Sequence, residues 1–287
     1  MNTVFFGASS YVIPLIEFLS KSYDLQLVVT TEQKPTDAVI QYCTEQNIPY
    51  LSVTSLKDQD TRNKIQETNA QFAVLADFRL MVKEDVLNLF PKGIINIHPS
   101  LLPEYRGPTP GVAALLDGRD ITGVSLMILD TQLDHGPLIG QVSEHILPSD
   151  TAVSLYEKLF AKGAQLLAEK LPLYLEGKIE PKEQDHSKAT YTDFLNRDSG
   201  YIDIEKFQIS NFSPRGEAGK FQIENAIRAF FPWPTIWTLT TLHGKKVRIK
   251  FLPDKKVQVE GKNPMSYKDF INGYEEGKEI LGKLWLL

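Results

Sequence analysis

The stretch Asn96–Pro110, which reads NIHPSLLPEYRGPTP, brings an amide, an imidazole and several prolines close together. It starts where an apolar run, Gly93–His98, predicts the end of a strand, and open α/β sheets bind ligands beyond the carboxyl ends of their strands. Because Asn96 and His98 are two residues apart, an extended chain projects both side chains from one face. The prolines and the glycine that follow make the next loop stiff, which suits the positioning of side chains. The alternative is a strand end with a hydrogen-bonded histidine, followed by a proline-rich turn. Arg106 in this turn is either a residue that braces the loop or a contact for an anion.

A second polar segment, Leu129–Pro137 (LDTQLDHGP), follows another predicted strand, Val124–Leu129. We expect it to open at the same edge of the sheet. Asp130 or Asp134 could then lie beside His98, where a carboxylate favours the charged imidazolium. The alternative is an ordinary polar turn.

The first half of the chain alternates apolar runs with segments of helical period. Continuous apolar strands separated by helices are typical of a doubly wound, mostly parallel sheet that is covered on both faces. Besides the two strands above, we expect strands at Thr3–Gly7, Leu25–Thr30 and Phe72–Ala76, and helices at Pro14–Ser20, Asp37–Gln46 and Lys83–Phe90.

The second half predicts a different organisation. A capped amphipathic helix, Ala152–Leu175, ends the first domain (1–180), and Pro172 is expected to kink or divide this helix. The polar, proline-interrupted residues 181–203 predict a linker. Residues 204–287 predict a smaller, mainly β domain, with a helix at Ile223–Phe230 and strands at Trp237–Leu242, Lys245–Phe251 and Lys256–Val259.

Composition excludes several classes of protein. The first turn, Gly7–Tyr11, has one glycine where a dinucleotide fingerprint has three, and there is no phosphate-binding P-loop and no Cys/His cluster for a metal. The single cysteine, Cys43, fits a reducing compartment. No segment has the run of about 20 apolar residues that a membrane span needs. We therefore expect a cytoplasmic protein with neither a metal nor a membrane partner, and the sequence identifies no protein partner.

The charge is distributed unevenly. The net charge is −5, but residues 201–287 hold 14 Lys and Arg against 10 Asp and Glu. Seven of these basic residues cluster: Lys245, Lys246, Arg248, Lys250, Lys255, Lys256 and Lys262. Such a cluster indicates either a polyanion-binding surface or a solvated strand face.

NIHPSLLPEYRGPTP, followed after a strand by LDTQLDHGP, resembles the paired signature of the folate-dependent formyltransferases. VFFGASSYVIPLIEFL is similar to the first strand and helix of the members that act on methionyl-tRNA. AIRAFFPWPTIWT and VQVEGKNPMSYKDFINGY resemble the C-terminal domain of those members. The resemblance implies a formyltransferase-type, Rossmann-like domain followed by a reduced OB-like barrel.

The resemblance also implies roles for particular residues. The catalytic positions of the family fall on Asn96, His98 and Asp134. Its folate-contacting positions fall on Ser100, Leu101, Leu102, Pro103, Leu80 and Met81. The cosubstrate would be 10-formyltetrahydrofolate. When an amine attacks the formyl carbon, the amide and the protonated imidazole would donate to the oxyanion, and the carboxylate would keep the imidazole charged and correctly turned.

The identity of the acceptor amine is less constrained. Chain length and the basic second domain favour the amino group of aminoacylated initiator tRNA, methionyl-tRNA. In tRNA-directed members, however, the loop after the second strand is a longer basic insertion, which here shrinks to residues 31–37. A nucleotide-linked amino sugar is the alternative acceptor. Hydrolysis of the formyl-folate and RNA binding on a retired enzyme scaffold are two further alternatives.

Overall fold

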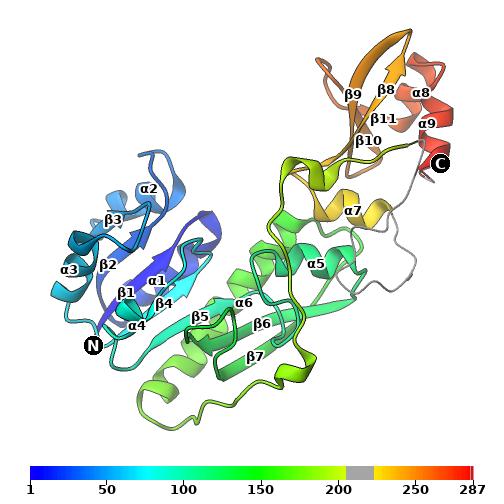
Figure 1. The fold of residues 1–287 in the computed structure, drawn as a ribbon. Helices are drawn as coiled ribbons and strands as arrows, with labels where there is room; N and C mark the ends of the chain where they lie inside the picture. Colours follow the sequence, from blue (N-terminus) through cyan, green and yellow to red (C-terminus); the bar gives the residue numbers. More distant parts are fainter. Residues whose placement is uncertain (205–222, 285, 287) are drawn as a thin grey trace. The chain divides into compact units, whose positions relative to one another are not determined.

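The computed structural model describes residues 1–204, 223–284 and 286. The chain forms two compact units (Figure 1). The first unit comprises Met1–Pro108, Thr122–Glu144 and Tyr156–Tyr191, and the second comprises Thr109–Ile121, His145–Leu155 and Thr192–Leu287. Of the expected C-terminal domain, 204–287, residues 205–222, 285 and 287 lie outside the described residues.

A seven-stranded sheet, in the order β3-β2-β1-β4-β5-β6-β7, forms the centre of the first unit. The strands from β3 to β5 in this order pair in parallel, which confirms the expected mostly parallel, doubly wound sheet. The strands are β1 (Asn2–Gly7), β2 (Asp24–Thr30), β3 (Tyr50–Ser52), β4 (Phe72–Ala76), β5 (Ile94–His98), β6 (Ile121–Ile128) and β7 (Leu138–His145). The helices between them are α1 (Ile13–Ser22), α2 (Ala38–Glu45), α3 (Gln59–Glu67) and α4 (Glu84–Leu87).

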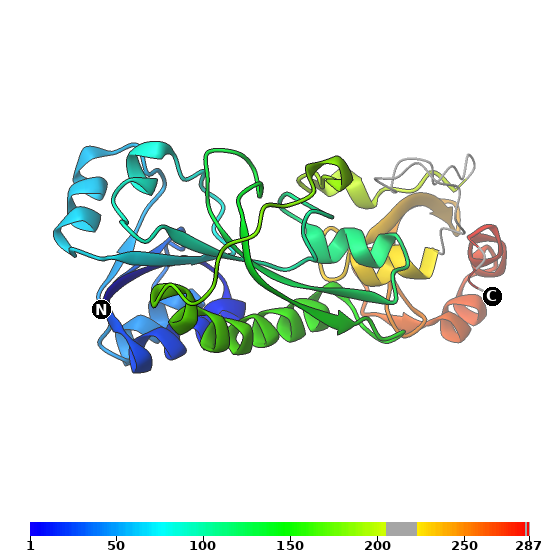
Figure 2. The same ribbon diagram turned by 90° about the horizontal axis from the view of Figure 1, so that it is seen from below.

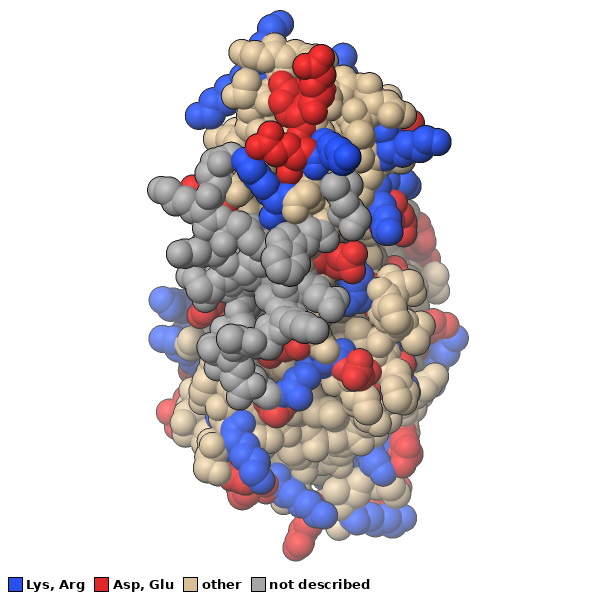
Figure 3. All heavy atoms as spheres, turned by 90° about the vertical axis from the view of Figure 1, so that its right-hand side faces the viewer, with Lys and Arg blue, Asp and Glu red and all other residues tan. Residues whose placement is uncertain are grey.

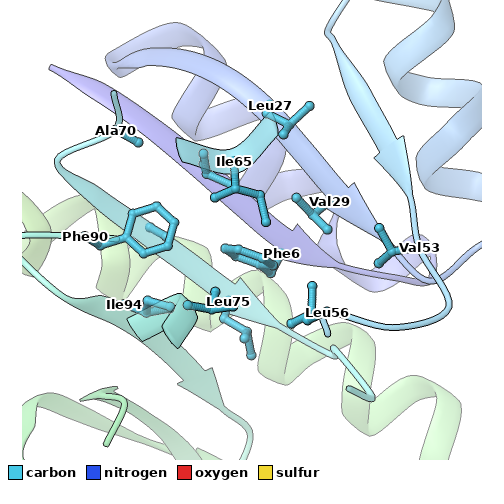
Figure 4. Packing of buried hydrophobic residues seen from close by; sticks show 13 residues of the cluster. Phe6, Leu27, Val29, Val53, Leu56, Ile65, Ala70, Leu75, Phe90 and Ile94 are labelled. Atoms are coloured by element: carbon cyan, nitrogen blue, oxygen red, sulfur yellow. The ribbon is translucent and has the colours of Figure 1, made fainter. Parts of the chain in front are cut away.

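The continuous apolar strands are explained by helices on both sides of this sheet. Figure 2 shows α1 and the long helix α6 (Ala152–Leu175) on the side opposite α3 and α4. On the α3 and α4 side, Phe6 lies at the centre of an apolar cluster that also contains Ile65 and Leu75 (Figure 4). The Phe6 ring meets Phe78 and Phe90 edge to face, at centroid distances of 5.4 and 6.0 Å.

The direction of β6 corrects one expectation from the sequence. β6 runs antiparallel to β5, with Ile95 opposite Ile128 and His98 opposite Ser125. The carboxyl end of β6 therefore lies beside the start of β5, at the edge away from His98. The expectation that both polar segments open at the same edge was wrong, because it assumed that the two strands were parallel.

Helix α6 fixes which face of β5 is free for chemistry. It runs unbroken through Pro172, which lies in its last turn, so the expected division of the helix does not occur. A Cβ added to Gly163 would lie 2.8 Å from Ile97 Cγ2, so the helix packs closely on the Ile97 side of β5. Since side chains alternate along a strand, Asn96 and His98 project from the other side.

Part of the segment expected as a linker packs on the first unit. Lys182 pairs with Leu138 of β7 through two backbone hydrogen bonds, of 2.7 and 2.8 Å. Tyr191 forms an isolated β-bridge with Arg106, and Gln184 between them is 6% exposed. Residues 182–191 are called the strap below.

The second unit has an antiparallel sheet in the order β11-β10-β9-β8, which agrees with the mainly β domain expected there. Two helices, α8 and α9, follow β11 and were not expected. The strands are β8 (Ile236–Leu242), β9 (Lys245–Leu252), β10 (Lys256–Val259) and β11 (Met265–Ser266). The helices are α5 (Pro110–Leu116), α7 (Ile223–Ala229), α8 (Tyr267–Gly273) and α9 (Gly277–Lys283).

On the surface drawn in Figure 3, basic and acidic side chains of the described residues are interspersed. In the described part of the chain, none of the helices combines the length and the apolar character needed to cross a membrane.

Candidate active site

Strand β5 carries the two polar side chains singled out in the sequence. Its residues are all buried, and Asn96 and His98 are 6% and 4% exposed. A buried polar side chain is costly unless it is hydrogen-bonded, so the partners of these two residues define the site.

The loop after β5 orients the His98 ring. The ring nitrogen Nε2 lies 2.9 Å from the backbone oxygen of Tyr105. A carbonyl oxygen only accepts, so Nε2 must donate and carry a hydrogen. Nδ1 is then the nitrogen that faces the carboxylate of Asp134, with Oδ2 at 3.7 Å.

Asp134 completes a three-residue cluster. Its Oδ1 accepts a long hydrogen bond from Asn96 Nδ2 (3.4 Å), and its Oδ2 accepts a short one from the backbone N–H of Gly107 (2.7 Å). The residue is 9% exposed and has a left-handed backbone, with φ at 46°. The structure therefore brings Asn96, His98 and Asp134 together.

The loop that carries Asp134 reaches the site by folding back along the sheet. Leu129 N–H donates to Ile94 O at the start of β5, and Ile128 N–H donates to Pro137 O where the loop returns. Gly136 permits this approach, since a Cβ there would lie 1.9 Å from Ile128 O. The loop after β6 therefore brings Asp134 to His98 although it starts at the opposite edge of the sheet.

Of the two aspartates left open in the sequence, Asp130 takes a different position. Its Oδ2 lies 2.7 Å from His135 Nδ1, and its Oδ1 accepts from the Gln132 N–H at 2.8 Å. Asp130 therefore shapes the loop, and Asp134 faces His98.

The loop expected to contact folate is held by hydrogen bonds that the sequence did not reveal. Ser125 Oγ donates to Ser100 O (2.6 Å) and accepts from Leu102 N–H (2.9 Å). Gln141 Nε2 donates to both Ser125 Oγ and Leu102 O, at 2.8 Å each. The Ser100 hydroxyl already donates to Glu104 O at 2.6 Å. These bonds fix the main chain of the loop.

The other expected folate-contacting residues have varied surroundings. Leu101 packs on β6, where a Cβ added to Gly123 would lie 2.5 Å from Leu101 Cδ2. Pro103 O accepts from the Thr190 N–H of the strap at 3.3 Å. Leu80 packs against the apolar cluster around Phe6, and Met81 is 75% exposed.

Arg106 is 2% exposed and braces the loop after β5 against the strap. Of the two roles left open for it in the sequence, the structure supports this one. Its Nη2 donates to Gln184 Oε1 and to His186 Nδ1, at 2.8 Å each, and its Nη1 donates to Tyr191 Oη at 3.3 Å. Gln184 was missed from the sequence, because polar residues in a predicted linker carry no signal of burial.

A second polar cluster lies at the ends of β1 and β4. Ser9 Oγ donates to Asp77 Oδ2 at 2.6 Å, and Ser9 N–H donates to Glu32 Oε1 at 2.9 Å. Glu32 Oε2 also accepts from the Val39 N–H of α2 at 2.7 Å, which closes the short loop after β2. Burial raises the pKa of Asp77, against the lowering effect of the Ser9 hydrogen bond.

Comparison with known proteins shows a consistent set of similarities. Residues 2–171 match the family described as formyl transferase. Methionyl-tRNA formyltransferase of Chloroflexus aurantiacus is 34% identical over 258 residues, which cover 87% of this chain and 79% of that protein. The namesake from Bacillus cytotoxicus is 31% identical, with coverage of 87% and 78%.

Solved structures share the fold. An N-formyltransferase from Helicobacter canadensis, crystallised with folinic acid and dTDP-3-aminofucose, aligns with a TM-score of 0.61 at 17% identity, covering 90% of this chain and 94% of that one. A phosphoribosylglycinamide formyltransferase from Bacillus halodurans aligns with a TM-score of 0.55 at 24% identity, covering 62% of this chain and 97% of that one.

Proposed function

The chain belongs to the formyl transferase family, and from that premise we propose that it transfers the formyl group of 10-formyltetrahydrofolate to the amino group of methionyl-initiator tRNA. Relatives of that activity at 30–34% identity, matched over most of their length, support the choice of methionyl-tRNA. Use of an aminoacylated tRNA would place the reaction in the cytoplasm.

The observation that carries the proposal is the convergence of Asn96, His98 and Asp134 on one face of β5. In the reaction, the amine nitrogen attacks the formyl carbon, and the carbonyl oxygen becomes an oxyanion. Asn96 Nδ2 and a proton on His98 Nδ1 would donate to this oxyanion, and one such donor is worth about 10²–10³ in rate.

Proton transfer completes the chemistry. The attacking amine loses a proton as the new C–N bond forms, and the folate nitrogen gains one as its bond to the formyl carbon breaks. Asp134 faces His98 Nδ1, and we propose that this pair accepts the first proton and returns the second.

The braced loop after β5 would hold the folate. The Ser100 hydroxyl donates to Glu104 O, and the main-chain groups of Ser100 and Leu102 also have partners within the protein. We therefore propose that residues 100–103 contact the folate mainly through apolar side chains, and that their carbonyl oxygens accept a second hydrogen bond from it. Leu80 and the exposed Met81 would contribute from the loop after β4.

The second unit offers cationic groups for the phosphates of the tRNA. Lys246, Arg248 and Lys250 alternate along β9 with Val247 and with the buried Ile249, so they share the outer face of the sheet. The short loop after β2, closed by Glu32, supplies no basic insertion. We therefore propose that β9 provides part of the binding energy.

The proposal is tested by supplying the purified protein with 10-formyltetrahydrofolate and charged initiator methionyl-tRNA. We expect formyl-methionyl-tRNA from the wild type and none from a folded His98→Ala variant, which serves as the control. Elongator methionyl-tRNA and a panel of amino-sugar nucleotides are run in parallel. Formylation of an amino sugar alone, release of formate alone, or tRNA binding without turnover would each overturn the proposal.

The role of β9 is tested by salt dependence. If Lys250 contacts a phosphate, Lys250→Ala should raise KM for the tRNA and reduce the slope of log KM against log salt by about 1. An unchanged slope would remove this residue from the proposed surface.

A further inference from the structure

The strap, residues 182–191, lies across both loops that form the candidate site. We propose that Gln184 of the strap is a positioning residue that holds Asp134 against His98. The inference rests on the proposed function, because it assigns Gln184 to the same reaction.

The Gln184 side chain makes three hydrogen bonds at this site. Its Nε2 donates to two backbone oxygens of the Asp134 loop, Asp134 O at 2.9 Å and Gly136 O at 2.8 Å. Its Oε1 accepts from Arg106 Nη2 at 2.8 Å. A neutral amide has two N–H donors, so both are committed to this one turn.

The turn that Gln184 holds has an unfavourable backbone. Asp134 has φ at 46°, in the left-handed region, which costs a non-glycine residue about 1–3 kcal/mol and persists only where surrounding contacts enforce it. Two hydrogen bonds to carbonyls on either side of His135 supply that enforcement.

The strap also fixes the opposite side of the site. Thr190 Oγ1 accepts from the Tyr105 N–H at 2.8 Å, and Thr190 O accepts from the Arg106 N–H at 2.8 Å. The Tyr105 carbonyl is the acceptor that orients the ring of His98. One segment therefore sets both the imidazole and the carboxylate that faces it.

The proposed reaction requires Asn96, His98 and Asp134 to stay close to one another. Asp134 lies 3.4 Å from the Asn96 amide and 3.7 Å from His98 Nδ1, so a further displacement would separate the three groups. A misplacement of 1 Å can cost about 10²-fold in rate.

The strap does not depend on Gln184 for its own attachment. Lys182 pairs with Leu138 through the backbone, and the His186 ring stacks on His135 at a centroid distance of 3.9 Å. We therefore expect variants at Gln184 to fold, with the turn at Asp134 loosened.

The test compares Gln184→Glu and Gln184→Ala with the wild type. Gln184→Glu keeps the size of the side chain and the acceptor for Arg106, but an ionised carboxylate donates to neither carbonyl. We expect kcat to fall by about 10-fold for alanine and about 100-fold for glutamate, with KM for both substrates changed less than threefold. If Gln184 only fills space, the order is reversed, because glutamate preserves the volume.

The matched control is Lys188→Ala, on the same strap, whose side chain is 75% exposed and pairs with Asp185. It should keep the wild-type kcat. Hydrogen exchange of residues 129–137, measured in the folded proteins, should be faster in both Gln184 variants and unchanged in the control.

Each result has a definite meaning. Wild-type kcat in both Gln184 variants, or an equal fall in the control, would overturn the inference. An inactive wild type would overturn the proposed function instead, and the exchange measurement would still show whether Gln184 holds the turn.

Discussion

Two aspartates of the first unit, Asp77 and Asp134, share an unusual backbone but differ in their partners. Their φ angles are 47° and 46°, and each follows a strand of the same sheet. Asp77 accepts a short hydrogen bond from the Ser9 hydroxyl, at 2.6 Å. Asp134 faces an amide at 3.4 Å and an imidazole nitrogen at 3.7 Å.

A structural carboxylate and a candidate catalytic one therefore differ in how tightly their partners hold them. Ser9 and Glu32 tie the ends of β1, β2 and α2 together, and Asp77 takes part in that closed network. Around Asp134, a tight bond from Gly107 fixes one oxygen, and the contacts to Asn96 and His98 are long. Contacts of that length can shorten when a substrate arrives, as catalytic hydrogen bonds often do.

The same substitution at both aspartates should have different consequences for activity. Asp134→Asn can still accept from Gly107 but carries no charge, so we expect kcat to fall by about 10²–10⁴-fold. Asp77→Asn should keep a kcat close to that of the wild type. Steady-state formylation of methionyl-tRNA measures both, and similar losses in the two variants would refute the distinction.

Removing the amide partner of Asp134 should have the next largest effect. Asn96→Ala deletes one proposed oxyanion donor, and we expect a loss of about 10²–10³ in kcat with little change in KM. The measurement is the same assay with the tRNA concentration varied. A rise in KM at constant kcat would instead make Asn96 a substrate-binding residue.

Removing the hydroxyl partner of Asp77 should affect stability alone. Ser9→Ala leaves a partly buried carboxylate without its short hydrogen bond, which we expect to cost about 1–2 kcal/mol in the free energy of unfolding. Urea denaturation gives that value, and kcat measured well below the transition should match the wild type. Loss of activity without loss of stability would contradict a structural role.

The smallest effect concerns the charge of Asp77. Its pKa is raised by burial above the ordinary value of 3.8, so the native state binds the proton more tightly than the unfolded state does. The stability that this proton contributes is present below about pH 4 and is lost as pH rises through the raised pKa. Asp77→Asn should therefore gain stability relative to the wild type as pH rises from 4 to 7, in melting curves recorded across that range.

Much of the fold could be predicted from the sequence, because the strands of a covered parallel sheet are continuous apolar runs. Phe72–Ala76 and Ala152–Leu175 have the predicted bounds. The short strand β3 and the helix α3 were not predicted, since the former has three residues and the latter is largely polar.

The candidate site was predictable only in part. The spacing of Asn96 and His98 placed them on one face, but the direction of β6 could not be inferred from its apolar pattern, which is the same for parallel and antiparallel strands. Gln184 and Ser125 hold the site through hydrogen bonds between residues far apart in the sequence. Local composition contains no signal of such contacts.

Gly163 of α6 packs on the side of β5 that faces away from Asn96 and His98, so a larger side chain at this position would displace the strand. An alanine there would press on Ile97, and a strand that shifts by a few tenths of an ångström would carry both neighbours of Ile97 with it. Substitutions in α6 would therefore lower or abolish the activity without altering any residue that touches a substrate.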